Sequence, residues 1–423
     1  MNVRKGLVAS ASAMGLMLMS QGAGAFGMME VGEWKVEFSG NVNGFISDVK
    51  CDAGAGLVLS GLACGSLTGV DYDDNNVRTG LLPSWLGFHA ERTEENTKYG
   101  VTIGFQPGID SNTGIAGGPI DGALGLNSAN FRQVFLEWSG TNWGGIKIGR
   151  DLGLFGSDAI LSDMTLLGVG TVSDLTAGGG NTSLGRIGVG YLYADWKGQV
   201  QYSSPKFGGF TFNVALVDPW GLVNLSGTSS NAASFSQEGS TYGFEGKAAY
   251  AWEGDFSGKI WASFISQALK TTDPTSSDED AIGYDVGAKV GFGGFEVVGY
   301  YYTGEGIGST GFLVDAVDFN DITGASDARD SDGMYVQATF KLPGAGTKIG
   351  VSWGESNLDL GPNDTDPGDT ALFETNESIV FGVYHPLTSA LHLVFEYTQT
   401  ESTAHNGNKA EETAIALGAI LFY

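Results

Sequence analysis

The side chains best suited to acid–base and nucleophilic chemistry are sparse in this chain. Its four histidines, His89, His385, His392 and His405, lie in different segments, and no Gly-x-Ser-x-Gly sequence is present. A hydrolase needs a nucleophile, a base and an orienting group within mutual reach. We therefore expect no enzymatic activity, and a phospholipase or protease is the least favoured hypothesis.

Clusters of carboxylates offer a second kind of chemistry, the binding of hard cations. Residues 71–74, 278–280 and 364–366 are rich in aspartate and glutamate, whose oxygens are ligands for calcium and magnesium. None of these segments has the spacing of a known calcium loop, and no set of histidines and cysteines suggests a transition-metal site. We expect solvated charge that holds divalent cations loosely, leave a specific metal site open, and expect no cofactor.

The N-terminus has the pattern of a secretory signal peptide. Arg4 and Lys5 precede an apolar run over residues 7–19, and residues 23–25 are small enough for a cleavage site. The run is shorter than the roughly twenty residues that a spanning helix needs, which disfavours the alternative of an uncleaved anchor. We expect residues 1–25 to be a signal peptide and residues 26–423 to form one exported domain.

The two cysteines, Cys51 and Cys64, lie close together in the sequence of this exported chain. Disulfides persist outside the reducing cytosol. We expect the two to be paired, with a stabilisation of a few kcal/mol from the restricted unfolded chain.

Period-two alternation of apolar and polar residues recurs along the chain from Trp34 onward. Trp34, Val36 and Phe38 would share one face of a strand, with Lys35 and Glu37 on the other. The last residues, 413–423, alternate in the same way and end on an aromatic residue, as membrane strands do. The 68 glycines among 423 residues also disfavour a helical protein.

Local alternation fits a soluble sandwich as well as a membrane barrel, so the connections decide between them. Short polar turns alternate with long loops along the chain, which is the pattern of outer-membrane barrels. We predict a transmembrane antiparallel β-barrel of about sixteen strands, wide enough to enclose water. The predicted strands cover residues 34–46, 80–92, 99–106, 131–139, 145–150, 186–204, 210–217, 241–252, 257–268, 282–292, 295–303, 332–341, 347–354, 377–385, 391–400 and 412–423.

The charge of the chain is strongly acidic and unevenly placed. Nearly all of the net charge of −27 falls in the predicted long loops, whereas the predicted lumen-facing positions mix lysines, arginines and carboxylates. A negative mouth concentrates cations over about a Debye length, so we expect a modest preference for cations. Acidic loops also keep an external surface soluble, which is the simpler explanation. A pI near 4.3 argues against nucleic-acid binding.

The chain resembles the general porins of Gram-negative outer membranes. The resemblance rests on Gly149-Arg150 before a long loop, the segment 202–210 at a strand–turn–strand junction, and the terminal Tyr423. It implies a homotrimer of sixteen-stranded barrels in the outer membrane, each narrowed by an inward-folded third loop. Such proteins pass small hydrophilic solutes and ions by passive diffusion, surrounded by lipid and lipopolysaccharide.

The resemblance also implies a constriction in which loop carboxylates face basic wall residues. Asp158 and Asp163 are the loop candidates, and Arg150 and Arg186 match the wall arginines before and after the loop. Strict alternation would turn Arg150 towards lipid, so we expect a bulge at Gly149 to turn it inward, with snorkelling as the alternative. Trp85 departs from the family, where an arginine is common, which implies a less basic wall.

Aromatic residues on lumen-facing positions raise a second transport hypothesis. Trp85, Trp261, Tyr300, Tyr302 and Tyr335 have this parity, and aromatic faces can stack on sugars and other partly apolar solutes. A solute-selective channel with a saturable site is therefore the alternative to an open sieve. Packing against loops or in a trimer contact would explain these residues equally well.

Overall fold

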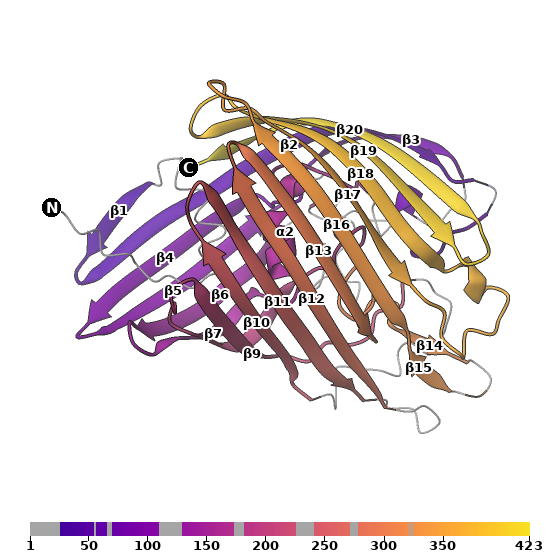
Figure 1. Ribbon diagram of the computed structural model, residues 1–423, viewed down its shortest axis with the longest axis horizontal. Coiled ribbons are helices and arrows are strands. Elements are labelled where there is room, and N and C mark those ends of the chain that lie inside the picture. Colours follow the sequence, from indigo (N-terminus) through magenta and orange to yellow (C-terminus); the bar gives the residue numbers. More distant parts are fainter. Residues whose placement is uncertain are drawn as a thin grey trace.

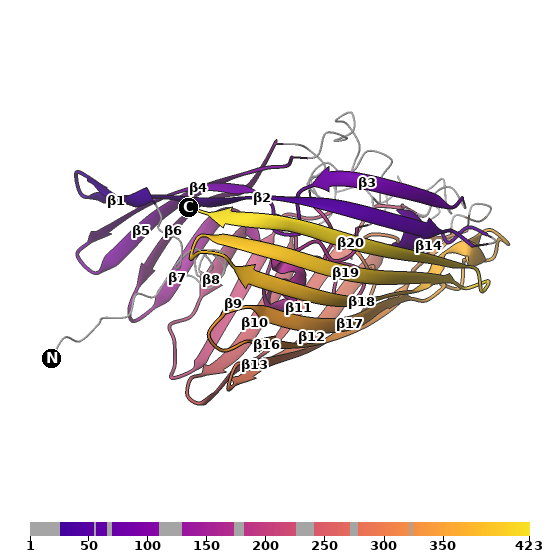
Figure 2. The ribbon, with the colours of Figure 1, turned by 90° about the horizontal axis from the view of Figure 1, so that it is seen from above.

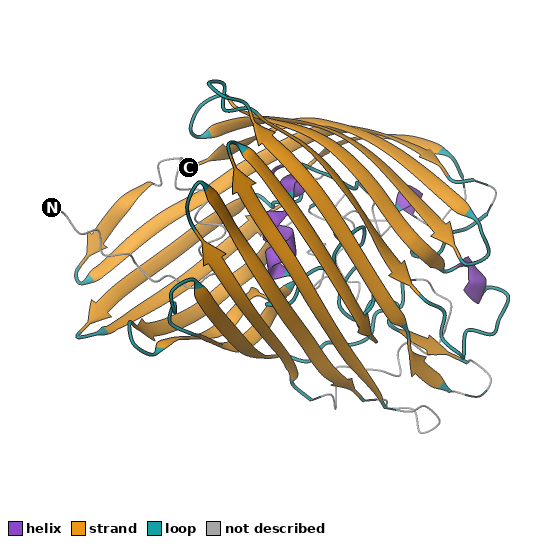
Figure 3. Cartoon of the chain, viewed as in Figure 1, coloured by secondary structure: helices purple, strands orange, loops and turns teal. Residues whose placement is uncertain are grey.

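Antiparallel β-strands form nearly all of the regular structure. The computed structural model describes residues 26–54, 56–65, 70–109, 129–172, 182–225, 241–270, 278–320, 323 and 325–423, so the expected signal peptide lies outside the described residues. The strands wrap into a closed barrel, with a short helix inside the ring of strands (Figures 1 and 3). The predicted fold class is confirmed.

The strands that build the wall are long, and each pairs with its sequence neighbour. They are β1 (Phe26–Val31), β2 (Trp34–Asp52), β3 (Tyr72–Arg78), β4 (Trp85–Glu94), β5 (Thr97–Pro107), β6 (Ala129–Gly140), β7 (Gly144–Leu152), β8 (Trp196–Ser203), β9 (Phe210–Val217), β10 (Gly243–Trp252), β11 (Phe256–Leu269), β12 (Glu279–Phe292), β13 (Phe295–Glu305), β16 (Asp330–Lys341), β17 (Lys348–Leu358), β18 (Phe373–Pro386), β19 (Leu391–Ala404) and β20 (Lys409–Phe422). A small hairpin of β14 (Val317–Phe319) and β15 (Ser326–Ala328) lies in the connection between β13 and β16.

The barrel closes at β2, which has two strands along each edge. On one edge, β3 pairs with the part from Phe45 to Cys51 and β4 with the part from Lys35 to Asn41. On the other edge, β20 pairs from Asn41 onward, and β1 continues the same edge past the end of the chain (Figure 2). β3 and β4 together occupy one strand position of the wall, and β1 and β20 together occupy another. The eighteen strands therefore form a sixteen-stranded barrel.

The connections divide the barrel into two ends. Tight turns join pairs such as β4–β5, β12–β13 and β18–β19 at one end, which we call the turn end. Most connections at the opposite end, the loop end, are long, but the one between β19 and β20 spans only the residues from Ala404 to Lys409. The sequence predicted eight long loops, and this eighth one is instead short.

The helices within the described ranges are short. They are η1 (Ala63–Gly65), α2 (Ser157–Ser162), η2 (Met164–Leu167) and η4 (Asp369–Ala371). No helix in the described ranges has both the length and the apolar character needed to cross a membrane.

The two faces of the wall differ as the alternation predicts. On β12, Ile282, Tyr284 and Val286 are exposed on the outside, whereas Ala281 and Asp285 are buried on the inside. Aromatic rings line the outside near the turn end, where Tyr250 stacks on Trp252 and Phe292 on Phe295. An apolar outer band with interfacial aromatics is what a bilayer requires of a barrel.

One predicted strand is wrong over half of its length. The sequence placed a strand over residues 186–204, but β8 begins at Trp196 and residues 186–195 fold inside the barrel. Ile187, Val189 and Tyr191 alternate like a membrane strand, yet all three are buried in the interior. Gly188 and Gly190 have φ of 74° and 147°, values that an extended strand does not have, and they turn the chain inward.

Candidate functional site

The connection between β7 and β8 folds into the lumen and packs there, as the resemblance implied. It carries α2 and η2, and we call its described residues, 153–172 and 182–195, the inner loop. Its side chains, including Phe155, Met164 and Leu192, join a buried apolar cluster with inward-facing wall residues such as Phe45 and Trp261. The lumen is therefore narrowed by a packed apolar body as well as by polar side chains.

Buried polar contacts attach the inner loop to opposite sides of the wall. On β10, the Glu245 carboxylate accepts from the backbone N–H of Leu154 and Phe155 and pairs with Lys197. On β19, the Glu396 carboxylate accepts from the backbone N–H of Val169, at 2.6 Å, and of Gly170. Charge-assisted bonds of this kind are stronger than neutral ones, so they fix the loop in one position.

Asp158 is the loop carboxylate that meets basic wall residues. Its Oδ2 lies 3.2 Å from Nζ of Lys247 on β10, and its Oδ1 pairs with Lys259 on β11. Burial acts to raise the pKa of Asp158, but the charges of the two lysines outweigh it and hold the pKa below its ordinary value. The carboxylate is therefore ionised at neutral pH, and opposite charges face each other beside α2.

The lysines that face Asp158 belong to a larger basic sector of the inner wall. Lys259 is paired directly across from Lys289 on β12, and Lys289 lies 3.0 Å from Glu296 on β13. About a third of each of the Lys259, Lys289 and Glu296 side chains is exposed (33%, 35% and 34%). We call Lys247, Lys259 and Lys289 the lysine sector. The partial exposure of Lys259 and Lys289 shows that solvent reaches the space next to these two lysines.

Asp163 and Arg186 lie together within the inner loop, so the expected place of Arg186 on a wall strand is wrong. The Asp163 carboxylate accepts from Thr165 and from the Tyr191 hydroxyl at 2.9 Å, and burial raises its pKa although Arg186 is close. The Arg186 guanidinium is fully buried and donates to the carbonyls of Ser352 and Ser378 on β17 and β18. This pair anchors the loop rather than lining open space.

Arg150 does not turn into the lumen through a bulge. The register between β6 and β7 runs without a shift to the pair Val134–Arg150, so the bulge expected at Gly149 is absent. Arg150 shares the outward-facing parity of Val134 and Ile148, which are 45% and 40% exposed. Its Nε donates to the Trp196 carbonyl at 3.2 Å, which holds the side chain at the loop end of β7.

The lumen-facing aromatics lie on the inner face, but the loops cover most of them. Trp261, Tyr300, Tyr302 and Tyr335 are at most 4% exposed. Tyr335 donates to the carbonyl of Ala159 in α2 at 2.9 Å, and Tyr300 donates to Asp285 at 3.2 Å. Tyr335 thereby supports the inner loop, and all four side chains are too deeply buried to stack on a solute.

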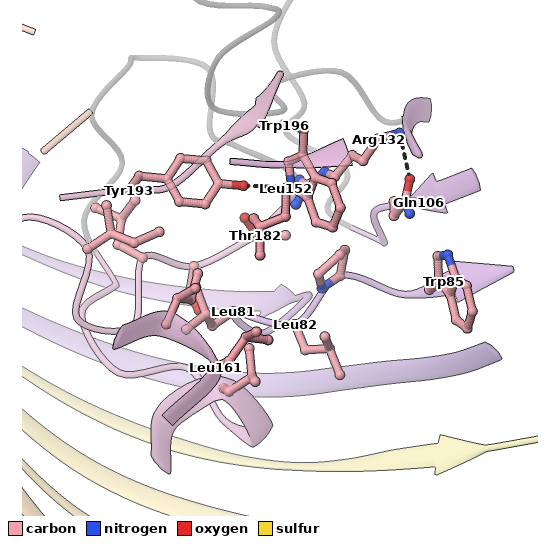
Figure 4. Close-up of a pocket in the computed structure, with 16 residues that line it drawn as sticks. Leu81, Leu82, Trp85, Gln106, Arg132, Leu152, Leu161, Thr182, Tyr193 and Trp196 are labelled. Carbon is pink, nitrogen blue, oxygen red and sulfur yellow. Dashed lines mark hydrogen bonds between the residues drawn. The ribbon is translucent and has the colours of Figure 1, made fainter. Parts of the chain in front are cut away.

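Trp85 lines a pocket between the inner loop and the wall strands β4 to β6 (Figure 4). Leu81, Leu82 and Leu161 form its apolar side, and Tyr193, Trp196 and Arg132 its opposite side. The indole N–H of Trp196 donates to the Tyr193 hydroxyl at 2.9 Å, which holds these two rings together.

The sequence pattern did not identify two buried arginines of the inner wall, Arg78 and Arg132. Arg78 donates to the carbonyl of Val172 at 2.9 Å, and Arg132 contributes to the pocket beside Trp85. Arg78 was placed in a loop because β3 has only a short alternating pattern. Arg132 was not predicted to face the lumen, because the register between β5 and β6 shifts between Gly104 and Phe105. This shift interrupts the alternation of inward and outward side chains along β6.

The structure joins Cys51 and Cys64 in a disulfide between β2 and η1. It folds the first long connection back over the barrel, where Leu62 and Ala63 donate backbone hydrogen bonds to Asn376 and Ser402. The bond thereby stabilises a segment that covers part of the loop end.

Several loop carboxylates have basic partners within the protein. Asp364 pairs with Arg329 in a buried ion pair, and Asp278 lies 2.6 Å from Nζ of Lys270. Burial raises the pKa of Asp318, which accepts from the backbone N–H of Asn363 at 2.7 Å. Across the described ranges, no group of three or more acidic, histidine or cysteine side chains has an arrangement that could hold a metal ion.

Comparison with known proteins was made at the levels of sequence and fold. A family model described as Gram-negative porin matches residues 7–405. No curated protein matches the sequence.

Among solved structures, the outer membrane channel DcaP of Acinetobacter baumannii is similar with a TM-score of 0.66 and 14% identity, covering 94% of this chain and 99% of that one. The anion-selective porin of Comamonas acidovorans has a TM-score of 0.59 and 16% identity over 92% and 100% of the chains. The trimer form of OmpT of Vibrio cholerae has a TM-score of 0.50 and 15% identity over 92% and 99%. At these low sequence identities, the similarity shows a shared fold only.

Proposed function

This chain belongs to the Gram-negative porin family, and we propose that it forms a water-filled passage for passive diffusion of small hydrophilic solutes and ions. It is an outer-membrane channel protein, as the family and the sixteen-stranded barrel show. The observation that carries the proposal is the group of Lys259, Lys289 and Glu296, whose charged side chains face the lumen and are each about one third exposed. Charged side chains keep such exposure only where water reaches them.

The passive nature of the passage is tested by solute uptake into liposomes that contain the purified protein. We expect swelling rates that fall steadily with solute size and rise linearly with concentration for most neutral solutes. Liposomes without the protein are the control. Swelling that is independent of solute size, or no swelling above the control, would contradict a sieving channel.

For ion preference we propose a modest bias towards cations that depends on salt. The net charge of −27 lies mostly at the loop end, and its field extends over about 10 Å at 0.1 M salt but only about 3 Å at 1 M. The lysine sector acts at short range on ions that pass it. We therefore expect cation preference in dilute salt and little or none in concentrated salt. The anion-selective porin among the similar structures shows that the fold permits the opposite bias.

A solute-selective channel is the second candidate, and the pocket at Trp85 is the observation that favours it. The four other lumen-facing aromatics are at most 4% exposed, whereas Trp85, Tyr193 and Trp196 line this pocket.

For the assembly we propose a homotrimer surrounded by lipid and lipopolysaccharide. The trimer form of the similar OmpT supports the first part, and the apolar outer wall with its aromatic stacks supports the second. Loosely held divalent cations would bridge the acidic loops to lipid phosphates, which requires no fixed metal site.

We assign no catalytic role to the chain. His89 comes nearest to a catalytic arrangement, with Nδ1 3.0 Å from the Thr102 hydroxyl and Nε2 3.6 Å from Glu91. Thr102 is 1% exposed, so a substrate cannot reach its oxygen. Lipase or peptidase turnover by the purified protein would overturn this assignment.

A further inference from the structure

Two pairs of lysines on the inner wall place like charges opposite each other near the turn end. Lys259 on β11 lies directly across from Lys289 on β12, and Lys341 on β16 lies directly across from Lys348 on β17. We call these four residues the turn-end lysines. Like charges directly opposite each other destabilise a sheet, so a bound anion would relieve the repulsion in both pairs.

The turn-end lysines face the interior of the barrel, and solvent reaches them. Each has the inward parity of its strand, and the strands β11, β12, β13, β16 and β17 follow one another around the wall (Figure 1). Lys259 and Lys289 are 33% and 35% exposed, Lys341 is exposed, and Lys348 is partly buried. The four ammonium groups therefore line one sector of the interior next to water.

Only one of the two pairs is matched by carboxylates of the protein. Lys259 pairs with Asp158, and Lys289 lies 3.0 Å from Glu296. In the part of the chain that the structure describes, Lys341 and Lys348 have no carboxylate within ion-pair distance. Lys348 instead has its Nζ 4.8 Å from the centre of the Tyr384 ring. This second pair therefore keeps its charge available for a ligand.

The two pairs belong to one electrostatic environment. The charges of Glu296 and Lys289 both act on Lys348, although the three residues come from three different strands. The adjacent strand position between the pairs is β13, which carries Glu296. An anion near Glu296 would therefore interact with lysines on both sides of β13.

The other carboxylates of this part of the interior are not exposed to the solvent beside the lysines. Asp163, Asp285 and Glu396 are at most 5% exposed. They hold the inner loop, where Asp285 accepts from the backbone N–H of Gly156 at 2.9 Å and Glu396 from that of Gly170 at 2.8 Å. The accessible charges of the sector are thus the four turn-end lysines and Glu296, a positive excess in a chain of net charge −27.

The chemistry of these groups indicates the kind of anion. An ammonium group offers three donors and a full charge, and its hydrogen bonds to charged oxygen atoms are stronger than neutral ones. A doubly charged anion gains about twice the Coulomb energy of a singly charged one at the same distance from each lysine. Four lysines against one accessible carboxylate leave more than one positive charge to balance, which favours the doubly charged anion.

We propose that the turn-end lysines form a subsite that binds a small oxyanion with two negative charges, of which inorganic phosphate is the simplest. The proposal rests on the proposed channel function, because the anion reaches the lysines through the water of the lumen. The subsite lies at the end opposite to most of the acidic loops, the end that faces the periplasm in outer-membrane barrels. Binding there makes the passage of such anions saturable.

The test is block of single-channel current by inorganic phosphate at about pH 8, where phosphate carries close to two negative charges. In about 0.1 M potassium chloride, where the Debye length is about 10 Å, we expect the wild-type current to fall with phosphate concentration and to saturate. The acidic loop end repels anions, so the half-blocking concentration should be lower from one side of the bilayer than from the other. Acetate, with one charge, should block much less.

Neutralising the pair without carboxylate partners tests the residues themselves. Lys348→Gln and Lys341→Gln should each raise the half-blocking phosphate concentration by about three- to tenfold, because each removes one ammonium group from the anion. Neither change leaves a carboxylate without its partner. Lys348→Arg keeps the positive charge and should retain the saturable block, which a merely structural role of the lysine stem would not predict.

The matched control is Lys206→Gln, which removes the same charge from an exposed residue in the turn between β8 and β9. It lies at the same end of the barrel but on other strands, and its half-blocking concentration should equal that of wild type. The gel mobility of the folded barrel, which unfolding shifts, checks that every variant folds.

The outcomes separate this proposal from the proposed function. No conductance in potassium chloride would overturn the channel itself, whereas normal conductance with no saturable phosphate block would overturn the subsite alone. Equal block in wild type, Lys341→Gln and Lys348→Gln would also overturn it, as would equal half-blocking concentrations from the two sides of the bilayer. Acetate that blocks as strongly as phosphate would overturn the preference for two charges.

Discussion

At the scale of single residues, we propose that Asp158 influences passing ions, because it pairs with Lys247 and Lys259, and the Lys259 side chain is about one third exposed. Asp158→Asn should leave both lysines uncompensated and shift permeation towards anions. One charge about 10 Å from an ion in water contributes about 0.4 kcal/mol, or about a twofold change in the permeability ratio. Reversal potentials in a potassium chloride gradient measure this shift.

The control for that variant is Asp330→Asn, which removes a carboxylate on the outward-facing side of β16. Asp330→Asn removes the same charge as Asp158→Asn, but from a residue that does not face the lumen. Its reversal potential should match that of wild type. An equal shift in both variants would show that Asp158 has no special place in the passage.

Protonation of Asp195, at the end of the inner loop, makes the stability of the folded protein depend on pH. Burial raises its pKa to about 7, against the bond from the Trp196 N–H and the charges of Lys197, Arg132 and Arg150. Between the ordinary pKa of 3.8 and the raised pKa of about 7, Asp195 holds a proton in the folded state that it has released in the unfolded state, so the stability from this group falls as pH rises through that range.

We therefore expect the folded barrel to resist heat better at pH 5 than at pH 8, as measured by the gel shift of the unfolded chain. Asp195→Asn should reduce this difference, because the amide stays neutral, and asparagine tolerates the φ of 54° at this position. A pH difference of full size in the variant would contradict the role of Asp195.

At the scale of elements, most strands were predictable from the alternation, whereas the inner loop was expected only from the family resemblance and its residues 186–195 were mistaken for a strand. β2 and β12 alternate cleanly because one side of each strand faces the membrane and the other the interior, so parity identifies them. Residues 187–191 show the same alternation, but their apolar side chains enter the apolar cluster inside the barrel. The alternation of apolar residues shows that one face of a segment is buried in apolar surroundings. It does not distinguish membrane lipid from a packed protein interior.

The residues of the candidate site were also only partly predictable from the sequence. Asp158 was found from its place in the third loop, but its partners, Lys247 and Lys259, lie far away in the sequence, and no local pattern pairs them with it. Arg186 was expected on the wall, and its role depends on Ser352 and Ser378, two polar residues without a sequence signal. Contacts between a loop and distant strands depend on the closed barrel and therefore need the structure.

The disulfide gives a prediction for the first long connection. Replacing Cys51 and Cys64 with serine should lower the unfolding free energy by about 2–4 kcal/mol, because the unfolded chain gains freedom. The heat resistance of the folded barrel should drop by the same amount in the variant and in reduced wild type, while a reductant should leave the variant unchanged. If the reductant had no effect on wild type, the disulfide would not contribute to stability.

At the scale of the whole molecule, charge is separated along the barrel axis. The sequence placed the acidic charge at the loop end, and the structure adds a lysine sector inside, so ions meet fields of opposite sign in turn. The permeability ratio of potassium to chloride should exceed one in about 0.05 M salt and approach one at about 1 M, where the Debye length is about 3 Å. A ratio that does not change with salt would place the selectivity in the lysine sector alone.

The central claim is that the wall encloses a passage for water and ions. Recording purified protein in planar bilayers tests it most directly. We predict stepwise insertion of a constant ohmic conductance that closes in groups of three, as independent passages of a trimer would. Bilayers that remain at baseline after insertion of the folded barrel would contradict the account.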